Sequence, residues 1–349
     1  MRLVLFSLLF ACCLSLGAQQ NPYQVYHRSN WQAVNPAAFD RAFYLNSNPG
    51  NSPTMIFAGS SNLQWIGVEG APQYHFASAE YAPYLRDPSL PPMRYGFQMA
   101  LDKTDILSRL HIGGNITYRI RLDRRSKFLY IGANVEGVFN RIDVAGIRLA
   151  DPSDPYATPK DQGGFLNSRS AYLDASLGIF YRRMLGGQGG SKHDAFVCGF
   201  SLPQAITMGL NKSDSVSLTP GALRNFYAMV GWFFDPGEYD AGIDFEPTIW
   251  VRGSRDFQYY TLPWLKGSPV SIDVNMRAYF GASGNNPQPL WVGLGIGTNT
   301  MLSADVGYQW SPEGGDGQSL RIGLGLTYPL GKIVRLGPTV EATVAYAIE

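Results

Sequence analysis

The fold is decided by the stretch Ile112-Gly113-Gly114-Asn115-Ile116-Thr117-Tyr118-Arg119-Ile120-Arg121-Leu122. Its even positions are apolar apart from one glycine, and its odd positions carry glycine or polar side chains. Because successive side chains of a strand point to opposite faces, this period of two predicts an amphipathic β-strand. A turn follows at Asp123-Arg124-Arg125-Ser126, and residues 129–139 repeat the alternation, so the two segments are predicted to form a hairpin.

The same alternation recurs along the chain. Clear copies lie at 272–280, 320–328 and 340–348, and weaker copies lie near 63–69, 73–82, 93–102, 169–183, 194–202, 223–234, 243–252, 289–299 and 300–310. The total is about fourteen strands, each near the roughly 9–11 residues that a tilted strand needs to cross a bilayer. After the N-terminus no segment shows the apolar stripe of an amphipathic helix, so we expect very little helix.

The N-terminus has the features of a secretory signal peptide over residues 1–18: a positive start, an apolar core and a small-residue end at Gly17-Ala18. A lipoprotein-like alternative exists at Leu9-Phe10-Ala11-Cys12. Residues 19–51 form a polar, turn-rich segment that we expect in the periplasm or folded into a lumen, and residues 52–349 form the β domain. The mature chain would keep only Cys198, so it has no intramolecular disulfide.

The residues at the polar positions favour a membrane barrel over a soluble sandwich. These positions carry mainly Gly, Ser, Thr and Asn with sparse charges, whereas a water-facing sheet usually carries many Lys and Glu. Aromatic residues gather near the expected strand ends, as in a girdle at the lipid–water boundary: Trp232, Phe233, Phe234, Tyr259, Tyr260, Trp264, Tyr308, Trp310 and Tyr328. A bilayer offers no partner for free backbone groups, so the sheet must close into an antiparallel, up-and-down barrel. Ile116, Tyr118 and Ile120 would then face lipid.

Composition and motifs give no sign of nucleic-acid binding or catalysis. Lys and Arg total 28 against 27 Asp and Glu, which leaves a net charge of +1 and no basic field for a nucleic acid. The four histidines, at 27, 75, 111 and 193, lack an i, i+4 partner and an adjacent carboxylate or cysteine pair, so we expect them at surfaces or interfaces. The glycine run Gly293-Leu294-Gly295-Ile296-Gly297 lies inside an alternating strand, where it indicates close sheet packing rather than a dinucleotide site. We therefore predict no catalytic residue, no cofactor and no metal.

Charged residues of both signs occupy the polar positions of the expected strands. We predict that they compensate one another across the barrel interior, because unpaired buried charges are costly. This candidate lumen charge network comprises Arg119, Arg121, Glu246, Arg252, Asp273, Arg277, Asp305, Arg321 and Glu341. Residues 151–168, rich in Pro and Gly, are expected to form an exposed surface loop.

Several stretches resemble the PorP/SprF family of outer-membrane proteins of the type IX secretion and gliding machinery. The stretches are Asn21-Pro22-Tyr23-Gln24-Val25-Tyr26, Asn35-Pro36-Ala37-Ala38-Phe39 and Gln64-Trp65-Ile66-Gly67-Val68-Glu69-Gly70-Ala71-Pro72, and, later in the chain, residues 225–232, 246–252, 290–295 and 307–310. The most specific is the string Gln-Trp-x-Gly-x-x-Gly-x-Pro. We expect Gln64, Trp65, Gly67, Gly70 and Pro72 to form a fixed turn on which a partner or plug packs; the alternative is an ordinary girdle tryptophan.

The resemblance implies a non-enzymatic barrel in the outer membrane that supports export or surface attachment of secreted cargo. It also implies periplasmic ring lipoproteins and a peptidoglycan-binding lipoprotein as partners, besides outer-membrane lipid. Two alternatives from other classes are a passive porin or small-solute channel and, less favoured, a secreted carbohydrate-active β protein. A porin would carry clustered like charges along its pore, whereas the polar positions of these strands carry charges of both signs.

Overall fold

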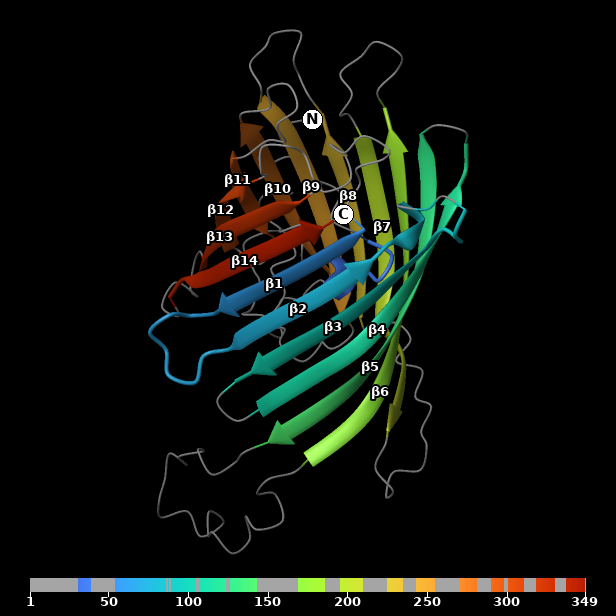
Figure 1. The fold of residues 1–349 in the computed structure, drawn as a ribbon. Helices are drawn as coiled ribbons and strands as arrows, with labels where there is room; N and C mark the ends of the chain where they lie inside the picture. The colour runs from blue at the N-terminus through green and yellow to red at the C-terminus, as the bar shows by residue number, and fades with distance from the viewer. Residues whose placement is uncertain are drawn as a thin grey trace, which may run out of the picture.

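Fourteen antiparallel strands close into one barrel in the computed structural model (Figure 1). The structure describes residues 31–38, 54–85, 87, 89–104, 107–123, 126–142, 169–185, 195–209, 225–234, 243–254, 270–280, 290–297, 301–310, 318–329 and 337–348. The strands are β1 (Met55–Leu63), β2 (Gln73–Tyr81), β3 (Met93–Lys103), β4 (Leu107–Arg121), β5 (Lys127–Ile142), β6 (Arg169–Met184), β7 (Ala195–Gly209), β8 (Asn225–Phe233), β9 (Ile243–Ser254), β10 (Val270–Phe280), β11 (Leu290–Gly297), β12 (Met301–Trp310), β13 (Ser319–Pro329) and β14 (Thr339–Ile348). The prediction of an all-β, up-and-down barrel of about fourteen strands is confirmed.

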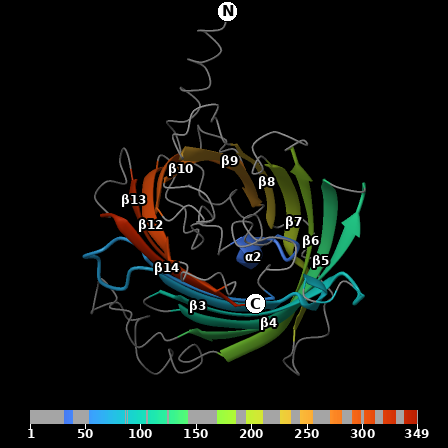
Figure 2. The same ribbon diagram turned by 45° about the horizontal axis from the view of Figure 1, so that its top comes forward.

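Each strand pairs with its sequence neighbours, and β1 closes the barrel by pairing with β14 from Met55–Ile348 to Leu63–Val340. The chain therefore enters the barrel at Met55 and leaves it at Ile348 on the same rim, which we call the terminal rim. The opposite rim holds the turn between β1 and β2. Figure 2 looks down into the ring, where the short helix α2 (Trp31–Val34) lies inside the wall.

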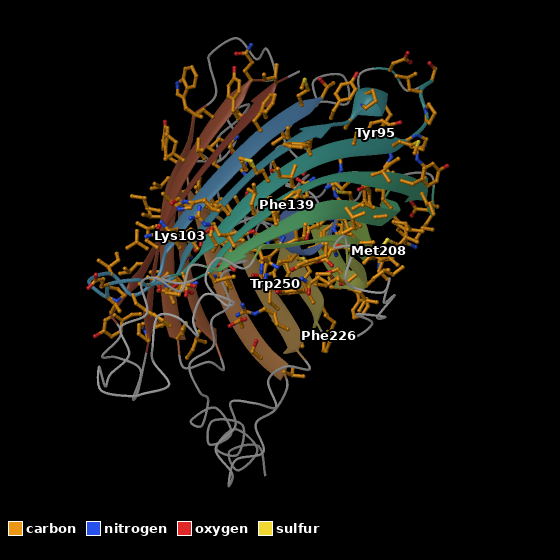
Figure 3. All side chains as sticks on the ribbon, turned by 90° about the horizontal axis from the view of Figure 1, so that it is seen from below. Tyr95, Lys103, Phe139, Met208, Phe226 and Trp250 are labelled. Carbon is orange, nitrogen blue, oxygen red and sulfur yellow. The ribbon has the colours of Figure 1, made fainter. Side chains whose placement is uncertain are left out.

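Side chains alternate between the lumen and the outer surface, as the sequence pattern requires. On β4, Thr117 is 1% exposed, whereas its neighbours Ile116 and Tyr118 are 40% and 47% exposed on the outer face. Tyr95 and Phe139, labelled in Figure 3, are also exposed outward. The barrel thus presents large apolar side chains outside and buries polar ones inside, which is the reverse of a soluble protein and fits a lipid surround.

Two details of the expected pattern are wrong. The strand expected near 63–69 is absent, because β1 ends at Leu63 and Trp65, Gly67 and Gly70 adopt positive φ angles that a strand does not accommodate. Phe233 does not belong to an outer girdle: it is 2% exposed and faces inward. The other girdle residues with described side chains that are exposed outward are Trp232, Tyr308, Trp310 and Tyr328.

Some expectations fall on residues outside those that the structure describes. These are the signal peptide over 1–18, the stretch 21–26, the loop 151–168, the histidines His27 and His193, and the aromatic residues Tyr259, Tyr260 and Trp264. Among the described helices, none is long and apolar enough to span a membrane.

Candidate functional site

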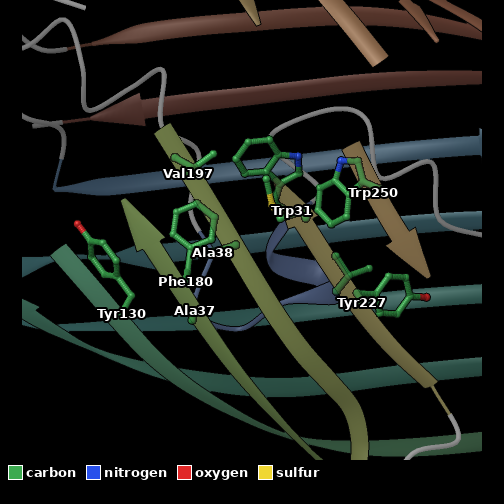
Figure 4. Close-up of a cluster of buried hydrophobic side chains, with 10 residues drawn as sticks. Trp31, Ala37, Ala38, Tyr130, Phe180, Val197, Tyr227 and Trp250 are labelled. Carbon is green, nitrogen blue, oxygen red and sulfur yellow. The ribbon is translucent and has the colours of Figure 1, made fainter. Parts of the chain in front are cut away.

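The lumen holds part of the N-terminal segment, residues 31–38, which we call the lumenal segment. It begins with α2, whose Trp31 is fully buried against the wall. The centroid of the Trp31 ring lies 5.9 Å from that of Trp250, in an edge-to-face arrangement, and 6.3 Å from that of Phe180 (Figure 4). Edge-to-face aromatic pairs contribute about 0.5–1.5 kcal/mol beyond their buried area. This packing fixes the segment to the inner faces of β6 and β9.

Polar groups of the wall bind the backbone of the lumenal segment. The Thr117 hydroxyl donates to the Pro36 carbonyl at 2.7 Å, and the Ser201 hydroxyl donates to the Val34 carbonyl at 2.6 Å. Arg94 donates to the Ala38 carbonyl at 2.9 Å and also forms an ion pair with Glu80 at 3.3 Å. Buried hydrogen bonds of this kind prevent the desolvation penalty that a free carbonyl would incur.

Asn35 anchors the segment to the backbone of β6 and β7. Its amide nitrogen donates to the carbonyls of Ile179 at 3.1 Å and Phe200 at 3.4 Å, and its Oδ1 accepts from the Ala37 amide at 2.9 Å. The stretch Asn35-Pro36-Ala37-Ala38 is part of the family resemblance in the sequence, and here each of its residues is buried.

Inward glycines make room for the lumenal segment. A Cβ at Gly132 of β5 would lie 2.6 Å from the backbone of Pro36 and Ala37, and a Cβ at Gly178 of β6 would lie 2.1 Å from Asn35 Oδ1. Only glycine allows the segment to approach the wall this closely. The glycine pattern in the sequence indicates sheet packing, but it contains no signal that Gly132 and Gly178 contact Pro36 and Asn35, far earlier in the chain.

The turn from Gln64 to Pro72 lies at the rim opposite the termini and contacts the neighbouring hairpin. The Gln64 amide donates to the Pro72 carbonyl at 2.9 Å, which closes the turn, and the Ile66 amide donates to the Pro338 carbonyl at 2.9 Å. Trp65 adopts a φ of 50°, a left-handed conformation that is rare for a bulky residue. Ile66 is 50% exposed, so the turn presents an apolar side chain at this rim.

The wall from β9 to β14 brings together seven residues of the candidate charge network: Glu246, Arg252, Asp273, Arg277, Asp305, Arg321 and Glu341. Arg252 forms an ion pair with Asp273, and Arg277 donates through Nε to Asp305 at 2.8 Å. The second pair spans β10 to β12 across the inward face of β11, over Gly293. A Cβ at Gly293 would lie 2.2 Å from Asp305 Oδ1, so the absence of a side chain is what lets the two charges meet.

Aromatic and amide groups complete this wall. Tyr279 donates to Glu246 at 2.7 Å, and the Trp291 indole donates to Asp305 at 3.0 Å. Arg321 donates to Gln309 Oε1 at 2.7 Å. Glu341 accepts from the Asn62 amide at 3.4 Å and lines, with Asp305, a cavity of about 20 Å³, which has room for roughly one water molecule.

The other two residues of the network, Arg119 and Arg121, lie apart from this wall, at the end of β4. Arg119 stacks 4.2 Å above the ring of Tyr84, which belongs to the short 3-10 helix η2 (Pro83–Leu85) between β2 and β3. Burial, the largest influence, raises the pKa of Tyr84 to about 12, with a further increase from Tyr130, against the opposing effect of Arg94 and Arg119. Tyr84 is therefore a neutral phenol at physiological pH and does not neutralise Arg119.

One polar cluster was missed at the sequence level. Glu136 of β5 lies inside the barrel and contacts His111 Nδ1 at 3.2 Å, Gln98 Nε2 at 3.2 Å and Asn134 Nδ2 at 3.4 Å. His111 is 8% exposed and faces the lumen, so of the expected surface or interface position the surface alternative is wrong for this histidine. The inward parity of His111 and Glu136 was readable in the sequence, but their contact depends on the register of β4 and β5. In the described part of the chain no group of three His, Cys, Asp or Glu side chains is placed to hold a metal ion.

Comparison with known proteins gives one family and a set of barrel structures. Residues 17–346 match the family described as type IX secretion system membrane protein PorP/SprF. A search of curated proteins gave no match. The chain is similar to the toluene transporter TodX of P. putida, with 11% identity, coverage of 92% of this chain and 94% of that chain, and a TM-score of 0.46. It is also similar to the outer membrane protein Omp33 of Acinetobacter baumannii, with 7% identity, coverage of 86% and 99%, and a TM-score of 0.38.

Proposed function

Because this chain belongs to the PorP/SprF family of type IX secretion system membrane proteins, we propose that it is a non-enzymatic outer-membrane barrel of that machinery, supporting export or surface attachment of cargo proteins. The observation that carries the proposal is the family match over residues 17–346, which includes both the barrel and the lumenal segment. The outward apolar side chains of a closed barrel support residence in a bilayer. The chain reaches the outer membrane through a cleaved signal peptide at residues 1–18.

The partners in this proposal are periplasmic ring lipoproteins, a peptidoglycan-binding lipoprotein and secreted cargo. The turn from Gln64 to Pro72 is the surface that we assign to secreted cargo, because it is held by the Gln64–Pro72 and Ile66–Pro338 hydrogen bonds and exposes Ile66 and Val68. A left-handed Trp65 supports this assignment, since backbone strain of about 1–3 kcal/mol per residue persists mainly where surroundings or function require it.

The experiment replaces Trp65 in the native host and follows cargo on the cell surface. Trp65→Gly removes the ring while fitting the φ of 50°, so the barrel should fold at least as well as the wild type. We expect surface cargo and co-purified partners to be lost in Trp65→Gly, as in a deletion strain, and retained in Trp65→Phe. Normal surface cargo in the deletion strain would contradict the secretion role, and normal cargo in Trp65→Gly alone would contradict the role of the turn.

The alternative, a passive porin, is opposed by the lumenal segment. Residues 31–38 occupy the lumen and are anchored by Thr117, Ser201 and Asn35, so they narrow any path through the barrel. We expect low conductance in planar bilayers for the wild type. Gly132→Val should displace the segment and raise conductance, since its Cβ meets the backbone of Pro36 and Ala37 at 2.6 Å.

Gly114→Val on the adjacent strand is the matched control for the conductance experiment. A Cβ at Gly114 points outward and meets its nearest atom, the Gly96 carbonyl oxygen, at 3.6 Å, an ordinary contact. Wild-type conductance of porin size would favour the channel alternative over a secretion component.

A further inference from the structure

Two arginines near the terminal rim are held by aromatic rings rather than by carboxylates. The Arg119 guanidinium lies 4.2 Å above the Tyr84 ring and 5.5 Å from the Phe128 ring, and the Arg121 guanidinium lies 5.9 Å from the same Phe128 ring. Cation–π contacts within about 6 Å orient a guanidinium without neutralising its charge. Both arginines are thus positioned, and among the described residues no side chain accepts a hydrogen bond from either guanidinium group.

Among the residues that the structure describes, neither Arg119 nor Arg121 forms an ion pair with a carboxylate. The nearby Glu80 forms an ion pair with Arg94, with 3.3 Å between Oε2 and Nη1. Asp123 Oδ2 lies 4.0 Å from Lys127 Nζ and accepts a hydrogen bond from the Ser126 hydroxyl. Tyr84, which interacts electrostatically with Arg119, is protonated at physiological pH. Among the described residues, this region therefore carries an excess of positive charge, in contrast to the paired wall from β9 to β14.

The site opens to the lumen and not to the bilayer. Arg119 and Arg121 share the inward parity of Thr117, which is 1% exposed and bonded to Pro36 of the lumenal segment. Phe128, which contacts both guanidinium groups, also packs against the buried cluster around Trp31. A lipid headgroup lies outside the wall, on the opposite face of β4, so a ligand of these arginines has to come from the mouth of the barrel.

We propose that Arg119 and Arg121 form a binding site for an acidic peptide segment of a partner protein, entering the barrel at the terminal rim next to the lumenal segment. Arginine forks recognise carboxylates by paired hydrogen bonds, and clusters of them are a common device for binding acidic motifs. The side chains of Tyr84 and Phe128 reduce the conformational entropy that the arginines lose on binding, because the guanidinium groups are already oriented. This site goes beyond the proposed function, and its test on purified protein is independent of cargo export.

The experiment measures binding of a fluorescent hexaglutamate peptide to the full mature chain in phosphatidylcholine nanodiscs, by anisotropy. We expect saturable binding that weakens as salt rises, and no binding of hexaglutamine. The double variant Arg119→Gln/Arg121→Gln should weaken binding by about tenfold or more, because two charge-assisted contacts are lost. Phe128→Leu keeps both charges but releases the guanidinium groups, and it should weaken binding by a smaller factor.

Arg183→Gln is the matched control, since Arg183 is an exposed, outward-facing arginine near the same rim, at the end of β6. It should bind hexaglutamate as the wild type does. Heat-modifiable migration of each variant on a gel shows that the barrel is folded. Equal binding by the double variant and the wild type would overturn the proposal, as would an equal loss in Arg183→Gln. Inorganic phosphate, or phosphatidylglycerol added to the disc, serves as a competitor at the same concentration as the peptide carboxylates. Displacement of the peptide by either competitor would overturn the proposal in favour of a phosphate site.

Discussion

At the scale of single residues, glycines decide which charged side chains can meet. Gly293 stands between Arg277 and Asp305 in the cross-strand register, and only its lack of a side chain allows their contact at 2.8 Å. Arg277 is 1% exposed, so its charge depends on this partner. Glycine in a strand interior normally costs stability, and here the ion pair across it offsets that cost.

We expect Gly293→Ala to destabilise the barrel, because its Cβ would lie 2.2 Å from Asp305 Oδ1 and 3.0 Å from Arg277 Cγ. Leaving one charge of a buried ion pair without its partner costs about 3–5 kcal/mol, which is the upper bound for a substitution that only displaces Asp305 from Arg277. The measurement is the free energy of unfolding in urea in detergent micelles. Gly59→Ala is the control, since its Cβ would meet no atom closer than 3.5 Å. Equal stability of the two variants would contradict the role of Gly293.

At the scale of the strand, alternation determines which face meets lipid. The period of two in β4, β10, β13 and β14 was readable in the sequence, and the exposed and buried positions follow it. Alternation does not reveal what fills the lumen. On β4 the inward Thr117 is bonded to Pro36, so its tolerance to substitution depends on the lumenal segment as well as on the strand.

A matched pair on β14 tests the facing of a strand without involving the lumenal segment. Val344 is 48% exposed outward, and Thr343 is 6% exposed and lines the cavity with Asp305 and Glu341. We expect Val344→Arg to impair membrane insertion, since a cation facing lipid at midplane costs about 2–4 kcal/mol. Thr343→Arg places its charge near two carboxylates and should insert better. The readout is the folded fraction in outer-membrane extracts, and equal fractions would contradict the assignment.

At the scale of the whole molecule, closure places both ends of the barrel on one rim. Met55 pairs with Ile348, so β1 starts where β14 ends, and the turn from Gln64 to Pro72 lies at the other rim. The longest connection in the sequence, residues 143–168, joins β5 to β6 on the side of that turn. Barrels of this kind have short periplasmic turns and longer extracellular loops, so we assign the terminal rim to the periplasm.

This orientation predicts which introduced cysteines a membrane-impermeant maleimide labels on intact cells. In a Cys198→Ala background, Val68→Cys should be labelled on intact cells, because Val68 is 41% exposed in the turn opposite the termini. Asp87→Cys, at an exposed site between β2 and β3 on the terminal rim, should be labelled only after lysis. The reverse labelling pattern would show that the barrel has the opposite orientation in the membrane, with the arginine site at the cell surface.

The sequence by itself determined the architecture, because a period of two repeated over about fourteen segments, with apolar residues on one face, specifies strands that must close in a bilayer. It also placed the charged residues on the inner face, since parity is a property of each strand alone. Only the tertiary structure decided which charges meet, that Gly132 and Gly178 receive the segment around Asn35, and that Arg119 and Arg121 stack on Tyr84 and Phe128. These contacts depend on register and on the return of distant chain segments into the lumen, and the alternation of one strand contains no information about either.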